Sequence, residues 1–296
     1  MKKAALIVFY LVIVAAVIGA QQNEFPNLAG PYLGQKLPGR TPGPFAENIA
    51  AIHRFLHSGI VFSPDGKEAY WKPDWNPRSP IYFSKVENGY WTVPQVAPFS
   101  KGDQGDDSPF ISPDGKKLFF ISQRAQKRRE SIWVMERTPQ GWSEPRLLPD
   151  IINSMDYIHW QFSVDLRGNL YFSAGVRGDG REGYIHCPKF ENGTYGSPER
   201  MGPEINKPGA YNYSPLISPD RRTLLFTRDQ NPAKLYLSFR KEDGGWTEAV
   251  DLSGFLPDQS CLNPFLTSDG KYLFFLVGGR PFWVSAEFIE ELRPKK

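Results

Sequence analysis

Cysteine is nearly absent from this 296-residue sequence, which contains only Cys187 and Cys261. Two cysteines cannot supply the set of disulfides that holds many small secreted domains together, so the fold must depend on a hydrophobic core. The two residues fall in different copies of the repeat described below. We therefore expect them to remain unpaired.

A strong charge of either sign is also missing, because 35 Lys and Arg residues oppose 32 Asp and Glu residues. The formal charge is +3, and it falls to +1 if Lys2 and Lys3 are removed with an N-terminal signal. Nucleic-acid-binding proteins usually carry a clustered basic surface. The composition therefore predicts no nucleic-acid partner.

Motifs of several enzyme classes are lacking. The sequence has no Gly-x-Ser-x-Gly segment and no glycine-rich phosphate-binding loop, which argues against serine hydrolases and nucleotide-binding enzymes. His57 and His159, with Asp106 or Asp107, are the residues that could hold a metal ion, but the two histidines belong to non-adjacent repeats. We predict neither a metal nor a cofactor.

The N-terminus has the pattern of a secretory signal peptide. Two lysines precede an uncharged, mostly apolar run from Ala4 to Ala20, and polar residues follow at once. We assign residues 1–20 to a signal peptide cleaved after Ala20 and expect a periplasmic or secreted protein. The alternative is an uncleaved membrane anchor, because the run is close to spanning length.

Sustained helical periodicity is missing between the two ends, whereas a phrase close to Ser-Pro-Asp-Gly recurs five times. The copies begin, at spacings of 49, 51, 55 and 49 residues, at Ser63, Ser112, Ser163, Ser218 and Thr267. Periods of this length are typical of solenoids and propellers. With 27 Gly, 27 Pro and 14% aromatic residues, the composition favours short strands joined by tight turns.

The second copy indicates how one repeat is built. Strands are expected over 108–112, 117–121, 131–135 and 142–148, with the Pro113-Asp114-Gly115 turn between the first two. Each of the other copies has a similar third segment, and most also have the fourth. Four antiparallel strands in about 50 residues form a propeller blade.

The fifth copy stops after its third strand, and residues 41–46 resemble the missing fourth one. We predict an all-β, five-bladed propeller over residues 41–289, in which the N-terminal strand closes the last blade. An extension over 21–40 precedes it, and a charged C-terminal tail over 290–296 follows. A six-bladed propeller is the alternative.

The segment Ser112 to Phe120, Ser-Pro-Asp-Gly-Lys-Lys-Leu-Phe-Phe, resembles the propeller repeat of the TolB family, a relative of WD-type repeats. Such blades also occur in the N-terminal domains of prolyl oligopeptidase-like enzymes and in stand-alone exported proteins. The resemblance implies a stand-alone exported propeller.

The function is expected on the rim where the inner strands begin, called here the channel mouth. The turn aspartates Asp65, Asp114, Asp165, Asp220 and Asp269 lie on the opposite rim and are interpreted as turn formers that accept backbone N–H groups. The predicted ligand-binding residues at the mouth are His57, Asp106, Asp107, Arg124, Tyr157, His159, Asn212, Arg228, Asn263 and Arg280.

This mixture of Arg, Asn, His and aromatic residues suits a protein, a peptide or an anionic glycan. We predict a binding or protein-interaction module rather than an enzyme, with membrane contact only if the signal segment is uncleaved. The alternative is a propeller-type carbohydrate-active enzyme, a glycoside hydrolase or lyase, in which Asp106, Asp107 and Asp156 are the only mouth carboxylates.

Overall fold

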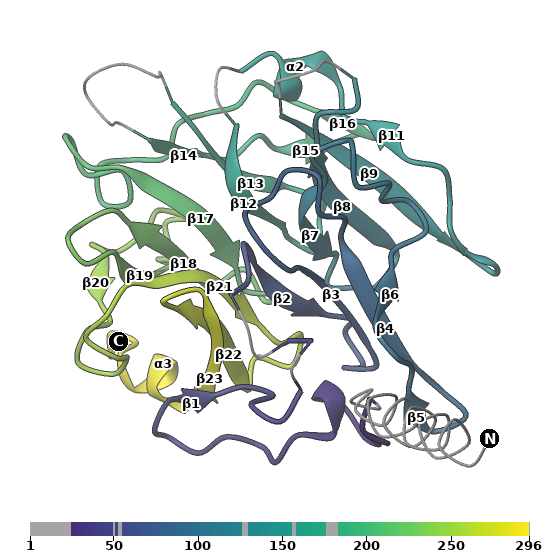
Figure 1. Cartoon of the computed structure of the whole chain (residues 1–296). Helices are drawn as coiled ribbons and strands as arrows, with labels where there is room; N and C mark the ends of the chain where they lie inside the picture. The colour runs from purple at the N-terminus through teal and green to yellow at the C-terminus, as the bar shows by residue number, and fades with distance from the viewer. Residues whose placement is uncertain are drawn as a thin grey trace, which may run out of the picture.

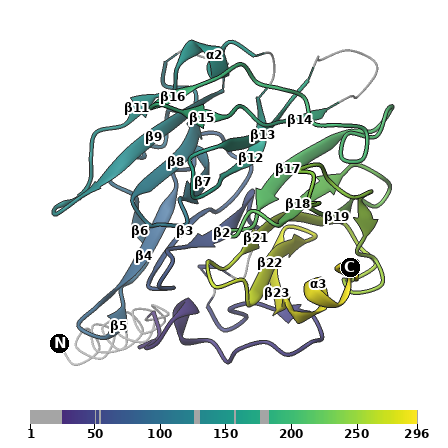
Figure 2. The same cartoon turned by 180° about the vertical axis from the view of Figure 1, so that it is seen from behind.

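The computed structural model describes residues 25–295 except 50, 53–54, 126–129, 156–157 and 176–182, and the side chains of 158–160 are not part of the description. The predicted signal peptide therefore lies outside the described residues. Small antiparallel sheets form five blades around a central axis, as predicted. Figures 1 and 2 show from opposite sides how the first strand of each blade lies nearest to this axis.

The strands of the blades follow one another along the chain. Blade 1 contains β2 (Ser58–Phe62), β3 (Glu68–Lys72), β4 (Tyr82–Glu87), β5 (Tyr90–Trp91) and β6 (Gln95–Val96). Blade 2 contains β7 (Asp107–Ile111), β8 (Lys117–Ser122), β9 (Ser131–Thr138), β10 (Gly141–Trp142) and β11 (Arg146–Leu147). Blade 3 contains β12 (Ile158–Val164), β13 (Leu170–Ala174) and β14 (Tyr184–His186). Blade 4 contains β17 (Asn212–Ile217), β18 (Thr223–Arg228), β19 (Lys234–Phe239) and β20 (Val250–Asp251). Blade 5 contains β21 (Cys261–Leu266), β22 (Tyr272–Val277), β23 (Arg280–Ser285) and β1 (Gly43–Pro44).

The outer edges of the blades are less regular than predicted. In blades 1 and 2 the expected fourth strand is split into two short segments that pair separately with the third strand. In blade 3 it is reduced to a single bridge between His186 and Arg200. The residues before that bridge form a separate hairpin of β15 (Phe190–Glu191) and β16 (Thr194–Tyr195).

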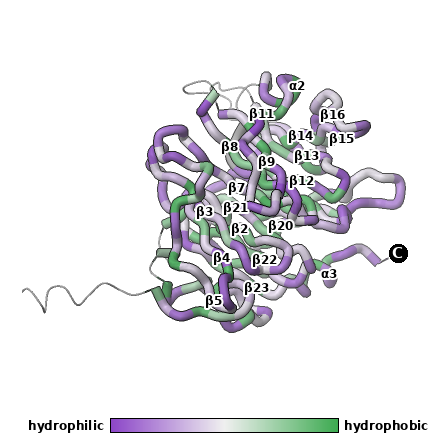
Figure 3. The backbone as a smooth tube through the Cα atoms, turned by 90° about the vertical axis from the view of Figure 1, so that its right-hand side faces the viewer, coloured by the Kyte–Doolittle hydropathy of each residue, from purple (hydrophilic) through white to green (hydrophobic). Residues whose placement is uncertain are grey.

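Three short helices complete the described chain, the first being the 3-10 helix η1 (Tyr32–Gly34) before β1. Helix α2 (Asp150–Asn153) lies between blades 2 and 3, and α3 (Glu287–Glu291) follows β23. None of the helices in the described part of the chain is long and apolar enough to cross a membrane. Figure 3 shows hydrophobic segments along the strands and hydrophilic segments along the connecting loops.

The N-terminal strand closes the ring, as predicted. Gly43 and Pro44 of β1 pair with Trp283 and Phe282 of β23, so blade 5 is assembled from both ends of the described chain. Phe45 follows β1 directly, and its backbone N–H donates to Pro281 O at 2.8 Å. Its fully buried ring packs edge-on at centroid distances of 5.8, 5.1 and 5.0 Å against Phe62, Phe274 and Trp283.

The structure corrects the register of the third repeat. In every other copy the first residue of the phrase accepts the N–H of the turn residue three positions later, as Ser112 does from Gly115. In the third copy Asp165, not Ser163, accepts this bond, from Gly168. The repeat therefore begins at Asp165, and the spacings become 49, 53, 53 and 49 residues.

We predict that Phe45→Ala lowers the free energy of unfolding by about 3–5 kcal/mol, because it leaves a cavity among three aromatic rings at the closure of the ring. Urea unfolding followed by far-UV circular dichroism measures the change. Leu37→Ala, at an exposed position of the same N-terminal segment, is the control and should change stability by no more than about 0.5 kcal/mol. Equal stability of the two variants would show that closure does not depend on Phe45.

Candidate functional site

The turn aspartates lie on the rim opposite the mouth and act within their turns, as predicted. Each accepts the backbone N–H two residues later, at 2.9–3.1 Å: Asp65 from Lys67, Asp114 from Lys116, Asp165 from Arg167, Asp220 from Arg222 and Asp269 from Lys271. These bonds fix the reversal between the first and second strands of each blade. Four of the five aspartates therefore have a role in the scaffold alone, whereas Asp165 is considered further below.

Inner-strand residues from three blades meet near the axis. A Cβ placed on Gly59 would lie 3.1 Å from the backbone oxygen of Asn263 and 3.2 Å from Nε2 of Gln161. Asn263 links the blades, because its Nδ2 donates to His57 O at 3.1 Å and its Oδ1 accepts from Ser214 Oγ at 3.1 Å. The predicted residue Asn263 thus lies on the channel wall with its amide engaged on both sides.

Asp106 and Arg124 form a pair inside blade 2. Arg124 Nη2 donates to Asp106 Oδ1 at 2.8 Å and to Phe99 O at 2.9 Å, and Ser100 Oγ donates to Asp106 Oδ2 at 2.9 Å. The Asp106 side chain is only 1% exposed. The guanidinium lies 4.7 Å from the centroid of the Phe120 ring. This geometry ties the loop before β7 to the end of β8.

Asn212 and Arg228 make a similar pair in blade 4. Arg228 donates from Nε to Asn212 Oδ1 at 2.8 Å and from Nη2 to Ile205 O at 2.9 Å. Its guanidinium lies 4.2 Å from the centroid of Tyr236, and both members of the pair are buried. Four of the predicted site residues therefore hold loops to the inner strands.

An exposed aromatic patch, made of Phe55, His57 and Trp75, lies at the mouth beside blade 1. His57 Nδ1 is paired with Asp107 Oδ2, a carboxylate of blade 2. The imidazole contacts Trp75 at a centroid distance of 4.1 Å, and Trp75 contacts Phe55 at 5.7 Å. Trp75 is nevertheless 58% exposed. The patch combines ordered aromatic rings with a surface that solvent reaches.

A buried lysine lies under the same region. Lys72, at the end of β3, donates from Nζ to Ser79 O and to Asn76 O, the latter at 3.1 Å. Burial lowers the pKa of Lys72 below its ordinary value, and the nearby carboxylates of Asp107, Asp74 and Asp106 oppose that effect. Its bonds to two carbonyls shape the loop that carries Trp75.

Arg280 is an exposed cation next to this patch. It follows Gly279, whose φ is +78° and whose position leaves no room for a side chain, since a Cβ would lie 2.3 Å from the Phe55 ring. The backbone N–H of Leu56 also donates to Gly279 O at 2.7 Å. The β22–β23 hairpin of blade 5 therefore supports Phe55 and places Arg280 beside it.

Three predicted residues lie partly or wholly outside the described residues. Tyr157 is one of them, as is Asp156. The backbone of His159 pairs with Ser173 within blade 3, but its side chain is not described.

Gln161 was missed at the sequence level. It is buried at the channel axis, and its Oε1 has no hydrogen-bond partner among the described residues. The two-residue error in the third repeat concealed it, because the corrected register aligns Gln161 with Asn263. Phe55 was missed because it precedes the first repeat and carries no repeat signal.

No group of three or more His, Cys, Asp or Glu residues in the described ranges is arranged to hold a metal ion. Cys187 and Cys261 are free thiols in different blades. At the mouth, Asp106 and Asp107 are paired with Arg124 and His57 respectively. The described mouth thus offers aromatic surface and the exposed arginines Arg78 and Arg280, whereas Asp106 and Asp107 are both engaged.

No protein-family model and no curated protein sequence matches this chain. Solved structures do match it. An α-L-arabinofuranosidase from Lactobacillus brevis aligns at 13% identity with a TM-score of 0.51, covering 76% of this chain and 84% of that one. An endo-arabinase from Bacteroides thetaiotaomicron aligns at 14% identity with a TM-score of 0.50, covering 78% and 94%.

TolB from Acinetobacter baumannii aligns at 16% identity with a TM-score of 0.49, covering 77% of this chain and 54% of TolB. The chain therefore spans about half the length of TolB. Enzymes and a TolB protein thus occur together among the similar structures. At these identities the similarity extends to the fold alone.

We predict that Arg124→Met lowers the free energy of unfolding by about 3–5 kcal/mol, because it leaves the buried Asp106 carboxylate without its cation. Thermal and urea unfolding measure the change, and the double variant Asp106→Asn/Arg124→Met should recover part of it. Arg280→Met is the control at an exposed mouth position and should be nearly neutral. If Arg124→Met were equally neutral, Arg124 would have no role in holding blade 2 together.

Proposed function

We propose that this chain is an exported binding module of the TolB-like propeller type, which holds its ligand at the channel mouth. The observation that carries the proposal is the aromatic patch, in which Trp75 is 58% exposed although the rings of His57 and Phe55 hold it on two sides. Exposed tryptophans with a fixed orientation are frequent anchors of binding surfaces.

The patch is organised before any ligand arrives. The His57–Asp107 pair joins blades 1 and 2, and Phe55 is fixed against Gly279 of blade 5. Three blades thus set the orientation of the Trp75 surface. Because these contacts already restrict the side chains, binding loses little conformational entropy there.

The chemistry of the patch indicates the kind of ligand. A flat indole surface suits a sugar ring or an apolar side chain of an extended peptide, and Arg280 beside it suits a carboxylate. We therefore propose a protein, a peptide or an anionic glycan as the ligand. The secretory signal pattern of residues 1–20 supports a periplasmic or extracellular location for this encounter.

We favour binding over the carbohydrate-active alternative because the described mouth carboxylates Asp106 and Asp107 already have partners. Glycoside hydrolysis requires an acid and a second carboxylate on either side of the scissile bond. Asp106 is buried in its pair with Arg124, and Asp107 is engaged by His57. Neither carboxylate can take such a role without giving up a contact that orders the mouth.

We predict that Trp75→Ala weakens ligand binding by roughly 10- to 100-fold, since a truncated aromatic anchor commonly costs about 2 kcal/mol or more. The protein, residues 21–296, is applied in solution to arrays of neutral glycans, uronic-acid-containing glycans and extended peptides. The affinity for each hit is then measured by calorimetry. Arg280→Gln should weaken binding of the anionic hits selectively.

Tyr90→Ala is the matched control, because Tyr90 is an exposed aromatic residue of β5 at the outer edge of blade 1. It should bind like the wild type. Hits that bind equally well to Trp75→Ala would contradict the proposed surface, and release of shorter products from any array glycan would favour the enzyme.

A further inference from the structure

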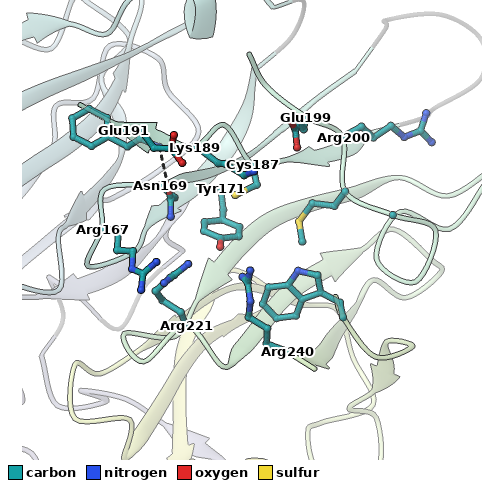
Figure 4. Close-up of a pocket in the computed structure, with 14 residues that line it drawn as sticks. Arg167, Asn169, Tyr171, Cys187, Lys189, Glu191, Glu199, Arg200, Arg221 and Arg240 are labelled. Carbon is teal, nitrogen blue, oxygen red and sulfur yellow. Dashed lines mark hydrogen bonds between the residues drawn. The ribbon is translucent and has the colours of Figure 1, made fainter. Parts of the chain in front are cut away.

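A cavity of about 440 Å³ lies between blades 3 and 4, on the rim opposite the mouth. The lining residues give this position: Arg167 and Arg221 belong to the turns between the first and second strands of these blades, and Arg240 follows β19 at the same end. Its volume falls within the range of small-molecule sites. Figure 4 shows Arg167, Arg221 and Arg240 converging beneath the Tyr171 hydroxyl, whereas Arg200 points away.

Arg221 is an exception within the repeat. The same turn position is occupied in the other four repeats by glycine, namely Gly66, Gly115, Gly168 and Gly270. Arg221 adopts the same left-handed conformation, with φ of +64°. That conformation is unfavourable for a residue with a side chain. We therefore expect Arg221 either to make a stabilising contact or to have a functional role.

Asp165 is the second exception, and it contacts the first. It stands where the other repeats have Ser or Thr, and its side chain is fully buried. Arg221 Nε donates to Asp165 Oδ2 at 2.7 Å, and Asn169 Nδ2 donates to the same oxygen at 2.8 Å. The two departures from the repeat pattern thus meet at this cavity.

An ion pair that only joined blades 3 and 4 would not account for the other arginines of the cavity, Arg167 and Arg240. Arg221 uses only Nε for Asp165, and no described residue accepts a hydrogen bond from its terminal nitrogens. Arg167 and Arg240 have no ion-pair partner among the described residues. Arg240 lies 5.4 Å from the centroid of Trp246, which forms an aromatic wall of the cavity.

Tyr171 and Cys187 add neutral groups to the wall. Burial raises the pKa of the Tyr171 hydroxyl well above its ordinary value, so it remains a hydrogen-bond donor. Burial likewise raises the pKa of Cys187 to about 11, so the thiol adds no negative charge at neutral pH. Glu191, Glu199 and Lys189 also line the cavity, but all three are exposed at its edge and lie apart from the three converging arginines.

We propose that this cavity binds a phosphate monoester whose attached ring packs against Trp246. The three converging guanidinium groups and the Asp165 carboxylate that contacts Arg221 together have a net charge of +2. This charge matches that of a phosphate dianion. A tetrahedral phosphate can accept hydrogen bonds from arginines on three sides, and arginine binds it bidentately. This site is independent of the aromatic patch at the mouth.

Calorimetry with phenyl phosphate and glucose 6-phosphate tests the proposal, with phenol, glucose, inorganic phosphate and the dicarboxylate phthalate as comparison probes. The two esters should bind more tightly than inorganic phosphate, and phenol and glucose should not bind. Arg167→Gln and Arg240→Gln should each weaken ester binding at least about tenfold, because each removes a charged hydrogen-bond donor. Arg222→Gln, an exposed neighbour outside the cavity, should remain within about twofold of the wild type.

The double variant Asp165→Ser/Arg221→Gly introduces the usual first residue in the turn of blade 3 and the usual glycine in the turn of blade 4. It should fold with a wild-type circular dichroism spectrum and unfolding midpoint and lose ester binding. If it does not fold, Arg167→Gln and Arg240→Gln decide the question, because both leave the Asp165–Arg221 pair intact. Unchanged affinity in these variants, or tighter binding of phthalate than of either ester, would overturn the proposal.

Discussion

The pairing of β1 with β23 is the interaction on which the rest of the structure depends. A propeller blade buries its faces only against neighbouring blades, so an open ring would expose both the unpaired edge of β23 and the faces of the terminal blades. The Gly43–Pro44 segment supplies the missing edge, and Phe45 fills the core behind it. Because the chain then runs from blade 5 to blade 1, the same closure brings Phe55 against Gly279 and assembles the mouth.

Burial separates two kinds of polar residue around the channel. The pairs Asp106–Arg124 and Asn212–Arg228 satisfy buried charges and carbonyls, and they hold the loops that precede the inner strands. His57 and Asp107 are also paired, but their contact orders a surface that solvent reaches. The same residue types therefore serve scaffold and surface, and the partners of each side chain determine which role it has.

Departures from the repeat carry more functional information than the repeat itself. The Ser-Pro-Asp-Gly turns are regular because every blade requires the same chain reversal between its first and second strands. Where Asp165 and Arg221 replace the usual residues, the turn geometry persists although a left-handed arginine is unfavourable. The exceptional side chains of two successive blades then meet across their boundary, which a comparison of single repeats cannot reveal.

The sequence by itself determined the number of blades, the turns between their first two strands and the closure by an N-terminal strand, since each depends on local residues at a regular spacing. It placed the third repeat two residues too early, because Ser163 resembles the usual first residue while Asp165 occupies its position. Which mouth residues are accessible was decided only by the tertiary structure. Arg124 and Arg228 look alike in sequence to Arg280, yet the first two are held among carbonyls, amides and aromatic rings, and only Arg280 is exposed. The partners that decide this come from loops and blades distant along the chain, so no local pattern specifies them.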